Sequence, residues 1–329
     1  MPLLDIIITH YNEPWSDGRK MFEMLKLQRG VDWKDVRVIL VQDGGDEQLD
    51  LPRIMKVYPF VQTILELPQG GVSTARNEGL ACAEAEWVMF CDFDDCLYSV
   101  DSLYRILESI RQAGDRADLI WSNIWIEMVA PGKKWMKRNK GWNTVFIHGK
   151  CYRRSFLEEH GIRYDPELCY SEDAMFNALV AMEIDQKRIA KMPETVYMWC
   201  FRAGSASNYT GGDARRNLSL YRKRVKLSEE YEKRGRSYDA KAAALRTLLD
   251  YYWELNGRDE CAGHTREEWI RLLQEDVIRR WPTAVMDVSP PDRAELYRIT
   301  REEADAKKLI RSGMPGVEEW LDSIGAIIK

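Results

Sequence analysis

Three carboxylates follow directly after a run of apolar residues. The apolar run is 87–91 (WVMFC), and the carboxylates are Asp92, Asp94 and Asp95. A short apolar run bounded by polar residues is typical of a buried parallel strand, and open α/β sheets bind ligands beyond the carboxyl ends of their strands. Crowded carboxylates repel one another unless a cation is present, and Mg²⁺ and Mn²⁺ prefer oxygen ligands. The block therefore predicts a site for Mn²⁺ or Mg²⁺. In isolation, a solvated acidic turn that opens the next helix explains it equally well.

The composition limits the kind of protein that this chain can be. It has 329 residues, of which 45% are hydrophobic and 31% charged, as in soluble globular proteins. The net charge of −5 gives no general attraction to nucleic acid or anionic membranes. Its 7 cysteines are scattered and odd in number, which favours reduced thiols over a disulfide framework or a zinc site. We therefore expect a cytoplasmic protein without a signal peptide or a transmembrane segment.

Strand and helix patterns alternate along the first part of the chain. Apolar, β-branched runs predict strands at 3–9, 36–41, 61–67 and 87–91, with helices at 14–28, 51–58, 73–83 and 101–112. This alternation is typical of βαβ units with a largely parallel sheet, whose loops meet at one edge. Further strands are expected at 119–128, 144–148 and 195–201, helices at 152–160 and 171–181, and a basic loop at 132–142.

The character of the chain changes near residue 213. Strand patterns end, and helical periodicities follow at 214–234, 238–256, 265–280, 292–311 and 317–328. The pattern predicts two domains, 1–212 and 213–329. The last helix is amphipathic, so it could touch a membrane surface or a partner, although packing on its own domain explains it as well.

Five blocks, in this order, resemble the inverting glycosyltransferases of family 2, which have the GT-A fold. The blocks are Thr9-His10-Tyr11-Asn12, Gln42-Asp43-Gly44-Gly45, Gly71-Val72-Ser73-Thr74-Ala75-Arg76-Asn77, Asp92-Phe93-Asp94-Asp95 and Ser171-Glu172-Asp173. The resemblance covers about 3–207. It implies a Rossmann-like α/β domain, with a mostly parallel central sheet flanked by helices, that binds a nucleotide-sugar. The all-α region after it would bind the acceptor or serve assembly, and oligomers could form through its helices.

The resemblance also implies a donor-nucleotide site. Its residues are Thr9, Tyr11, Asn12, Asp43, Gly71, Arg76, Asp92 and Arg202. Tyr11 offers a flat face to a nucleobase, and Asp43 at a strand tip can accept a hydrogen bond from the imide of uracil. The guanidinium groups of Arg76 and Arg202 can bind phosphate. Three of these residues also have an ordinary structural explanation: Tyr11 as the rim of the core, Asp43 in a turn, and Arg76 on the surface.

The same resemblance assigns the metal and the base. Asp94 would be the main metal ligand, Asp92 a ligand of the metal or the ribose, and Asp173 the general base, with Glu172 beside it. A cation there stabilises the departing nucleoside diphosphate as a Lewis acid. A carboxylate can remove the proton of an acceptor hydroxyl when that step is concerted with attack and the fold positions the group. Both acidic residues of the pair would also favour a helix N-terminus for electrostatic reasons alone.

A local excess of basic residues bears on the acceptor. Residues 133–154 contain eight Lys or Arg and no Asp or Glu, with Trp135 and Trp142 interleaved, and 215–226 is a second basic run. Such runs are often solvated faces, but basic residues with aromatics also bind polyanions. We therefore keep an anionic or polymeric acceptor as a hypothesis, whether glycan, lipid-linked saccharide, protein or nucleic acid.

The sequence thus predicts a metal-dependent inverting glycosyltransferase that uses a nucleotide-diphosphate sugar, with a UDP-sugar favoured. Two alternatives remain open. One is a non-catalytic GT-A-like binding or assembly module. The other is a phosphatase of the haloacid-dehalogenase type, in which Asp92 would be the nucleophile. In that family the second aspartate is normally followed by Gly-Thr, whereas here Asp95-Cys96 follows.

Overall fold

The computed structural model describes residues 2–130, 132–139, 145–203, 205, 214–257, 271, 288–306 and 308–321. The chain divides into two compact units, Met1–Asn208 and Tyr209–Lys329. We describe each unit by itself. The predicted boundary at residue 213 lies outside the described residues, so its position stays a prediction.

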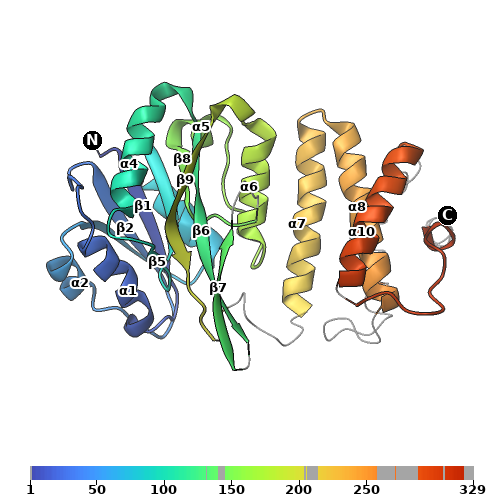
Figure 1. Cartoon of the computed structure of the whole chain (residues 1–329), viewed down its shortest axis with the longest axis horizontal. Coiled ribbons are helices and arrows are strands. Elements are labelled where there is room, and N and C mark those ends of the chain that lie inside the picture. Colours follow the sequence, from blue (N-terminus) through green and yellow to red (C-terminus); the bar gives the residue numbers. More distant parts are fainter. Residues whose placement is uncertain are drawn as a thin grey trace. The chain divides into compact units, whose positions relative to one another are not determined.

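The first unit begins with four parallel strands joined by helices, as the alternating pattern predicts (Figure 1). The strands are β1 (Leu4–His10), β2 (Val36–Asp43), β3 (Val61–Leu67) and β4 (Trp87–Asp92), and the helices between them are α1 (Trp15–Lys26), α2 (Leu51–Val57) and α3 (Val72–Ala81). They pair in the order β3-β2-β1-β4. Since each connection crosses over a helix, the carboxyl ends of these strands share one edge of the sheet.

Mixed pairing extends the sheet beyond β4. The remaining strands are β5 (Cys96–Leu97), β6 (Leu119–Ala130), β7 (Lys133–Asn139), β8 (Lys150–Arg153) and β9 (Ile189–Trp199). The order continues β4-β8-β6-β9-β5, and β7 pairs with β6 off this path. In this part of the sheet, beyond β4, the described strands β6 and β9 are the one parallel pair. The pairs β4–β8, β6–β8, β5–β9 and β6–β7 are antiparallel. Parallel pairing is thus confined to the first four strands and to β6 with β9.

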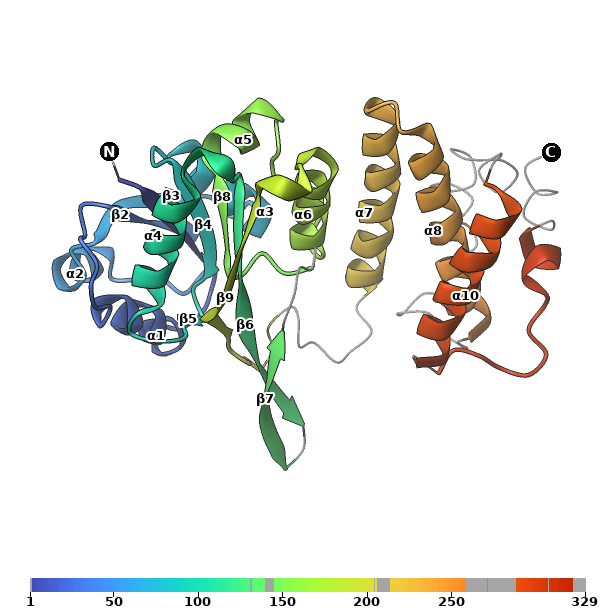
Figure 2. The ribbon, with the colours of Figure 1, turned by 45° about the horizontal axis from the view of Figure 1, so that its top comes forward.

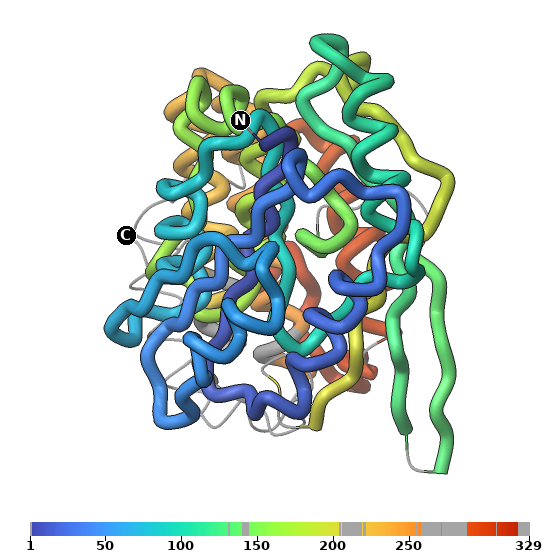
Figure 3. Tube along the Cα trace, turned by 90° about the vertical axis from the view of Figure 1, so that its left-hand side faces the viewer, coloured from blue at the N-terminus to red at the C-terminus, as the bar shows by residue number. Residues whose placement is uncertain are grey.

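Two details of the predicted pattern are wrong. The segment predicted as a basic loop contains β7, which forms a hairpin with β6 that extends beyond the rest of the sheet (Figure 3). The short strand predicted from residue 144 is absent from the described positions 145–148, and β8 begins at Lys150 instead. Because β7 is exposed along most of its length, it lacks the alternation of apolar and polar residues that identifies a half-buried strand.

Helices cover both faces of the sheet. Because alternate residues of a strand point to opposite faces, neighbouring residues of one strand pack against different helices. On one face, Ile6 and Met89 pack among residues of α1, α2 and α4 (Ser102–Ala113). On the other face, Ile7 and Phe90 pack among residues of α3, α5 (Arg154–Glu159) and α6 (Glu172–Glu183). Figure 1 and Figure 2 show the two sets of helices around the sheet. With both faces buried, β1 and β4 form a rigid base for the polar residues at their ends.

The described part of the second unit is helical, as predicted. Its long helices are α7 (Ala214–Lys233), α8 (Ser237–Gly257) and α10 (Pro290–Ala306) (Figure 2). Tyr252, Trp253 and Trp320 pack in its core, and the indole of Trp253 donates to the Thr300 hydroxyl at 3.2 Å. The helix predicted at 265–280 falls almost wholly outside the described residues, as does 322–328 at the end of the last predicted helix. Among the described residues, no helix has both the length and the apolarity that crossing a membrane requires.

Candidate active site

The predicted donor residues gather where the parallel strands end. Thr9 and Asp92 are paired across β1 and β4, and Asp43 is the last residue of β2. The backbone N–H of Phe93 donates to the Thr9 carbonyl at 3.2 Å, so the chain turns at this point into the acidic block. Asp92 thus lies at the tip of its strand, as the apolar run before it predicts.

Arg76 contacts three carboxylates that have two different predicted roles. Asp92 is predicted to bind the metal or the ribose, and Asp173, with Glu172 beside it, is predicted to be the base. Its Nη2 donates to Asp92 Oδ1 at 2.8 Å, and its Nη1 donates to Asp173 Oδ1 at 2.6 Å and to Glu172 Oε1 at 3.0 Å. The residue is only 2% exposed, and its guanidinium lies 5.1 Å from the centre of the Tyr164 ring. The structure therefore gives Arg76 the contacts of a buried hub between the acidic residues, in addition to any contact with a donor.

The charges at this hub shift each other's pKa. Burial opposes the charge of Arg76, but the carboxylates around it, Asp173 first, outweigh this and hold its pKa well above the ordinary value. Burial, and then the neighbouring Asp173 carboxylate, raise the pKa of Glu172 to about 7. Burial alone would raise the pKa of Asp92, yet Arg76 and His148 lower it. Asp92 is therefore held ionised, whereas Glu172 gains or loses its proton near neutral pH.

The backbone presents the acidic pair at the start of α6. Glu172 and Asp173 lie in the first turn of this helix, where the unpaired N–H groups favour negative charge. Ser171 before them has φ of 63°, a left-handed conformation that is uncommon outside glycine, asparagine and aspartate. The Ser171 side chain makes no capping hydrogen bond, although serine is a common cap of helix N-termini. The turn instead directs both carboxylates toward Arg76.

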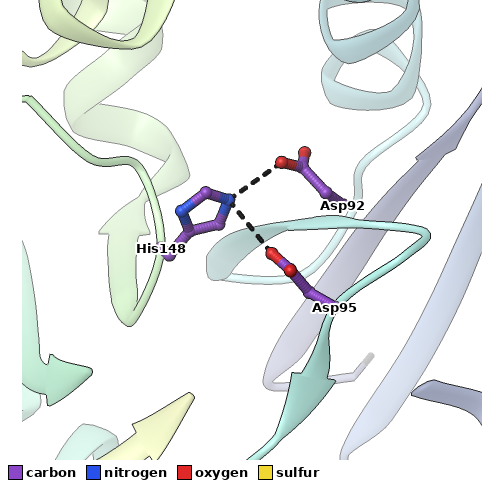
Figure 4. Close-up of side chains that lie close together, drawn as sticks. All are labelled: Asp92, Asp95 and His148. Atoms are coloured by element: carbon purple, nitrogen blue, oxygen red, sulfur yellow. Dashed lines mark hydrogen bonds and ion pairs between the residues drawn. The ribbon is translucent and has the colours of Figure 1, made fainter. Parts of the chain in front are cut away.

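A second network lies behind Asp92, and sequence reasoning missed its key member. His148 Nε2 lies 3.0 Å from Asp92 Oδ2 and 3.5 Å from Asp95 Oδ2 (Figure 4). The Tyr197 hydroxyl donates to Asp95 Oδ2 at 2.7 Å and accepts from the Asp92 N–H at 3.1 Å, and the Tyr197 ring stacks on His148. Burial would lower the pKa of His148, but Asp92 outweighs it and raises the value to about 9. Nothing in the sequence around His148 marks it, because its partner lies 56 positions away.

Arg202 contacts the predicted metal ligand. Its Nε donates to Asp94 Oδ2 at 2.6 Å, and its Nη2 donates to Glu13 Oε1 at 3.2 Å. Burial raises the pKa of Glu13 to about 7. Glu13 was not among the predicted site residues, although it lies beside the block Thr9-His10-Tyr11-Asn12. Arg202 and Asp94 were predicted, and the structure brings them together.

The other predicted donor residues lie in or at the start of the loops that follow β1, β2 and β3. Tyr11 is 41% exposed, and its hydroxyl accepts from Gln69 at 2.8 Å. Asn12, at φ of 57°, accepts from the N–H groups of Asp46 and Glu47. Asp43 Oδ1 accepts from the Gly70 N–H at 2.7 Å. Gly71 has φ of 86° directly before α3, a conformation that a side chain disfavours. These contacts tie together the three loops that carry the predicted nucleotide ligands.

The acidic residues suit a hard divalent cation. Asp92 and Asp94 supply carboxylate oxygens, the ligands that Mg²⁺ and Mn²⁺ favour, and their side chains are 28% and 16% exposed. Ligand atoms of Asp92, Asp95 and His148 also lie within 4.8 Å of one another. However, His148 already forms a hydrogen bond with Asp92 and an ion pair with Asp95. Asp94 and Asp92 as metal ligands therefore stay a prediction, and the structure adds His148 as a residue that lies between Asp92 and Asp95.

The sequence of this chain is similar to those of known glycosyltransferases. Residues 5–166 match the family described as glycosyl transferase family 2. The chain is 26% identical to the uncharacterized glycosyltransferase YibD of Escherichia coli (strain K12), over 71% of this chain and 72% of YibD. It is 23% identical to the uncharacterized glycosyltransferase EpsJ of Bacillus subtilis (strain 168), over 60% of this chain and 61% of EpsJ.

Solved structures show the fold. S. aureus TarS 1-349 in complex with UDP superposes with a TM-score of 0.63 at 16% identity, over 97% of this chain and 99% of that one. The mannosyltransferase PcManGT from Pyrobaculum calidifontis, in complex with GDP-Man and Mn²⁺, gives a TM-score of 0.51 at 14% identity, over 94% and 87%. The family match thus identifies residues 5–166 as a GT2-like glycosyltransferase domain, and the solved structures show that it has the GT-A fold, as the sequence blocks predict.

Proposed function

We propose that this protein transfers a sugar from a UDP-sugar to an acceptor hydroxyl, with inversion at the anomeric carbon and with Mn²⁺ or Mg²⁺. The observation that carries the proposal is the bridge through Arg76. One guanidinium binds both Asp173, the proposed base, and Asp92, the proposed donor and metal carboxylate. The groups for proton removal and for donor binding are therefore held in one site, as a single-displacement reaction requires.

The contacts divide the work among the residues. Asp173 directs Oδ1 to Arg76, and its second carboxylate oxygen would take the acceptor proton as the hydroxyl attacks. Glu172 lies beside Asp173 and also accepts a hydrogen bond from Arg76. Gain or loss of its proton would change the net charge around Arg76. Asp92 and Asp94 would hold the cation, which stabilises the departing diphosphate as a Lewis acid when bound. Arg202 would move from Asp94 to a phosphate oxygen, where a charge-assisted hydrogen bond is strong.

The proposed donor rests on the residues at the strand ends and on the structural neighbours. Asp43 and Tyr11 stand at the strand ends, where they suit a uracil ring and its imide. TarS is described in complex with UDP and with UDP-GlcNAc, whereas PcManGT is described with GDP-Man and Mn²⁺. These neighbours support a nucleotide-sugar and a divalent metal. A cytoplasmic location is likewise proposed, from the scattered cysteines and the free thiols at the described positions.

Thermal unfolding tests the proposal. The midpoint is measured with UDP, UDP-GlcNAc and GDP-mannose, each with and without Mn²⁺, for the wild type, Asp94→Ala and a control, Asp101→Ala. Asp101 is a half-exposed carboxylate paired with Arg105 at the start of α4, and it has no part in the site. A ligand at about 100 times its dissociation constant stabilises the native state by about 2.7 kcal/mol.

We expect UDP and one UDP-sugar to raise the midpoint only with Mn²⁺, in the wild type and Asp101→Ala but not in Asp94→Ala. A shift with GDP-mannose alone would show that the nucleobase of the donor is guanine and not uracil. No shift with any nucleotide would contradict the proposal and favour the non-catalytic binding module. A shift that survives in Asp94→Ala would remove that residue from the metal site.

A further inference from the structure

The β6–β7 hairpin carries a basic surface that the donor site does not use. Strand β7 contains Lys133, Lys134, Lys137 and Arg138 and no acidic residue. Across the hairpin, Glu127 of β6 is the one acidic residue, and it pairs with Lys134 at 2.5 Å. Among the described residues, neither Lys133 nor Lys137 has an ion-pair partner. The hairpin therefore presents uncompensated positive charge in a protein whose net charge is negative.

The free cations lie on one face of the strand, with an aromatic ring between them. Lys133, Trp135 and Lys137 alternate along β7, so their side chains point to the same face, about 6.8 Å apart from one to the next. Trp135 is 38% exposed, and the Lys133 ammonium lies 5.1 Å from the centre of its ring. We call these three residues the basic ladder. A flat apolar ring flanked by two ammonium groups offers stacking and charge to one extended ligand.

The root of the hairpin is joined to the donor site. Glu127 Oε2 accepts from the Phe201 N–H at 3.0 Å, and the next residue, Arg202, contacts Asp94. Strand β6 also pairs with β9 up to Ile126 and Trp199, close before Cys200, whose N–H donates to Asp95. The ladder strand β7 therefore pairs with β6, and β6 pairs with β9, whose end leads to the residues that contact the acidic block. A chain bound along the hairpin could place its end at the site.

We propose that the basic ladder binds the acceptor, and that the acceptor is an anionic polysaccharide. This inference rests on the proposed function, because the ladder would hold the acceptor of the proposed sugar transfer. The ammonium groups would contact the anionic substituents, and Trp135 would pack against the apolar face of a sugar ring. Single-stranded nucleic acid fits less well, since its binding sites stack successive bases on several aromatic rings, and the described part of β7 contains one.

Direct binding tests the inference without any donor. The probes are polygalacturonate, neutral dextran, inorganic polyphosphate and oligothymidylate, titrated at low and high salt. The hairpin variants are Lys133→Gln/Lys137→Gln and Trp135→Ala. The charge-matched control is Lys34→Gln/Lys56→Gln, which removes two exposed lysines from other parts of the same unit.

We expect polygalacturonate to bind the wild type and the control alike, with affinity that falls steeply as salt rises. Loss of both ladder lysines should weaken binding about tenfold at low salt, and Trp135→Ala should weaken polygalacturonate but not polyphosphate. Equal binding by the hairpin variant and the control, or equal binding of dextran, would overturn the proposal. Oligothymidylate bound more tightly than polygalacturonate, through the same residues, would replace the polysaccharide with nucleic acid.

The stabilising effect of UDP and Mn²⁺ is measured on the same variants. The hairpin variants should keep the full UDP shift, because the ladder is separate from the residues proposed to bind the nucleotide. Loss of the shift in the lysine variant would show that the substitutions disturb the fold, and binding by Trp135→Ala then decides the question. If UDP does not raise the unfolding midpoint of the wild type, the proposed function is overturned. Polygalacturonate binding would still test whether the basic ladder binds an anionic polysaccharide.

Discussion

Arg202 donates from Nε to Asp94 Oδ2 at 2.6 Å, so the arginine predicted to contact the diphosphate holds the aspartate predicted to bind the metal. Glu13 supports the same guanidinium at 3.2 Å. A divalent cation and Arg202 would compete for one carboxylate. A bound diphosphate would relieve that competition, because it offers Arg202 another anionic partner.

Replacing Arg202 should therefore move two affinities in opposite directions. In Arg202→Ala, we expect UDP affinity in saturating Mn²⁺ to fall about 10- to 100-fold, as for the loss of one charge-assisted hydrogen bond. Mn²⁺ affinity without UDP should rise, since the competing cation is gone. Calorimetric titration measures both. Arg188→Ala serves as control, because it removes an arginine that pairs with Asp118 away from the site. An unchanged UDP affinity, or weaker Mn²⁺ binding, would contradict this role.

Asp173→Asn should separate chemistry from donor binding. The amide oxygen can still accept from Arg76, but it cannot take a proton, so we expect kcat to fall about 10²- to 10⁴-fold. The rate of UDP release from the donor that stabilises the wild type most is the measurement, with water as acceptor. The UDP-dependent thermal shift should be retained. Asp185→Asn, at an exposed turn where Asp185 accepts from the Lys187 N–H, provides the control. Wild-type turnover in Asp173→Asn would exclude Asp173 as the base.

Arg76→Met should be among the most destabilising single substitutions in the first unit. It leaves Asp92, Glu172 and Asp173 without their shared cation, and breaking a buried ion pair costs about 3–5 kcal/mol. Urea unfolding measures the loss. The double variant Arg76→Met/Glu172→Gln should recover part of it, because one of the unpaired carboxylates is gone. Unchanged stability with weakened UDP binding would instead favour the predicted contact of Arg76 with the donor.

Glu172 should make stability depend on pH. Its pKa is about 7 in the folded protein against 4.5 in the reference state, so the native state favours its protonated form. The stability that this form provides is present below pH 4.5 and is lost as pH rises through about 7. Glu172→Gln cannot ionise, so its free energy of unfolding relative to the wild type should increase over that range and level off above it. A difference that stays constant with pH would show that Glu172 is not held in this environment.

Much of the fold could be predicted from local patterns. The strand at 61–67 was predicted with the bounds that the structure has, Val61–Leu67, because Val, Thr, Ile and Leu predominate in it and Pro68 follows. The last strand of the unit was predicted from residue 195, whereas β9 begins at Ile189. Its first half contains Lys191 and Pro193, which interrupt any apolar pattern. An apolar pattern in the sequence identifies buried strands. It does not identify a segment such as the first half of β9, which forms a strand because it pairs with β6.

By itself, the sequence determined the residue types at the ends of the buried strands, and so the presence of an acidic site. The apolar run before Asp92 allows no other environment for that strand than a core, and this places the carboxylate at its edge. Only the tertiary structure decided which charges meet. Arg76 lies 96 and 97 positions from the acidic pair, and His148 lies 56 positions from Asp92. Such pairings depend on crossover connections and mixed strand order, which bring distant segments to one edge without leaving any local pattern in the chain.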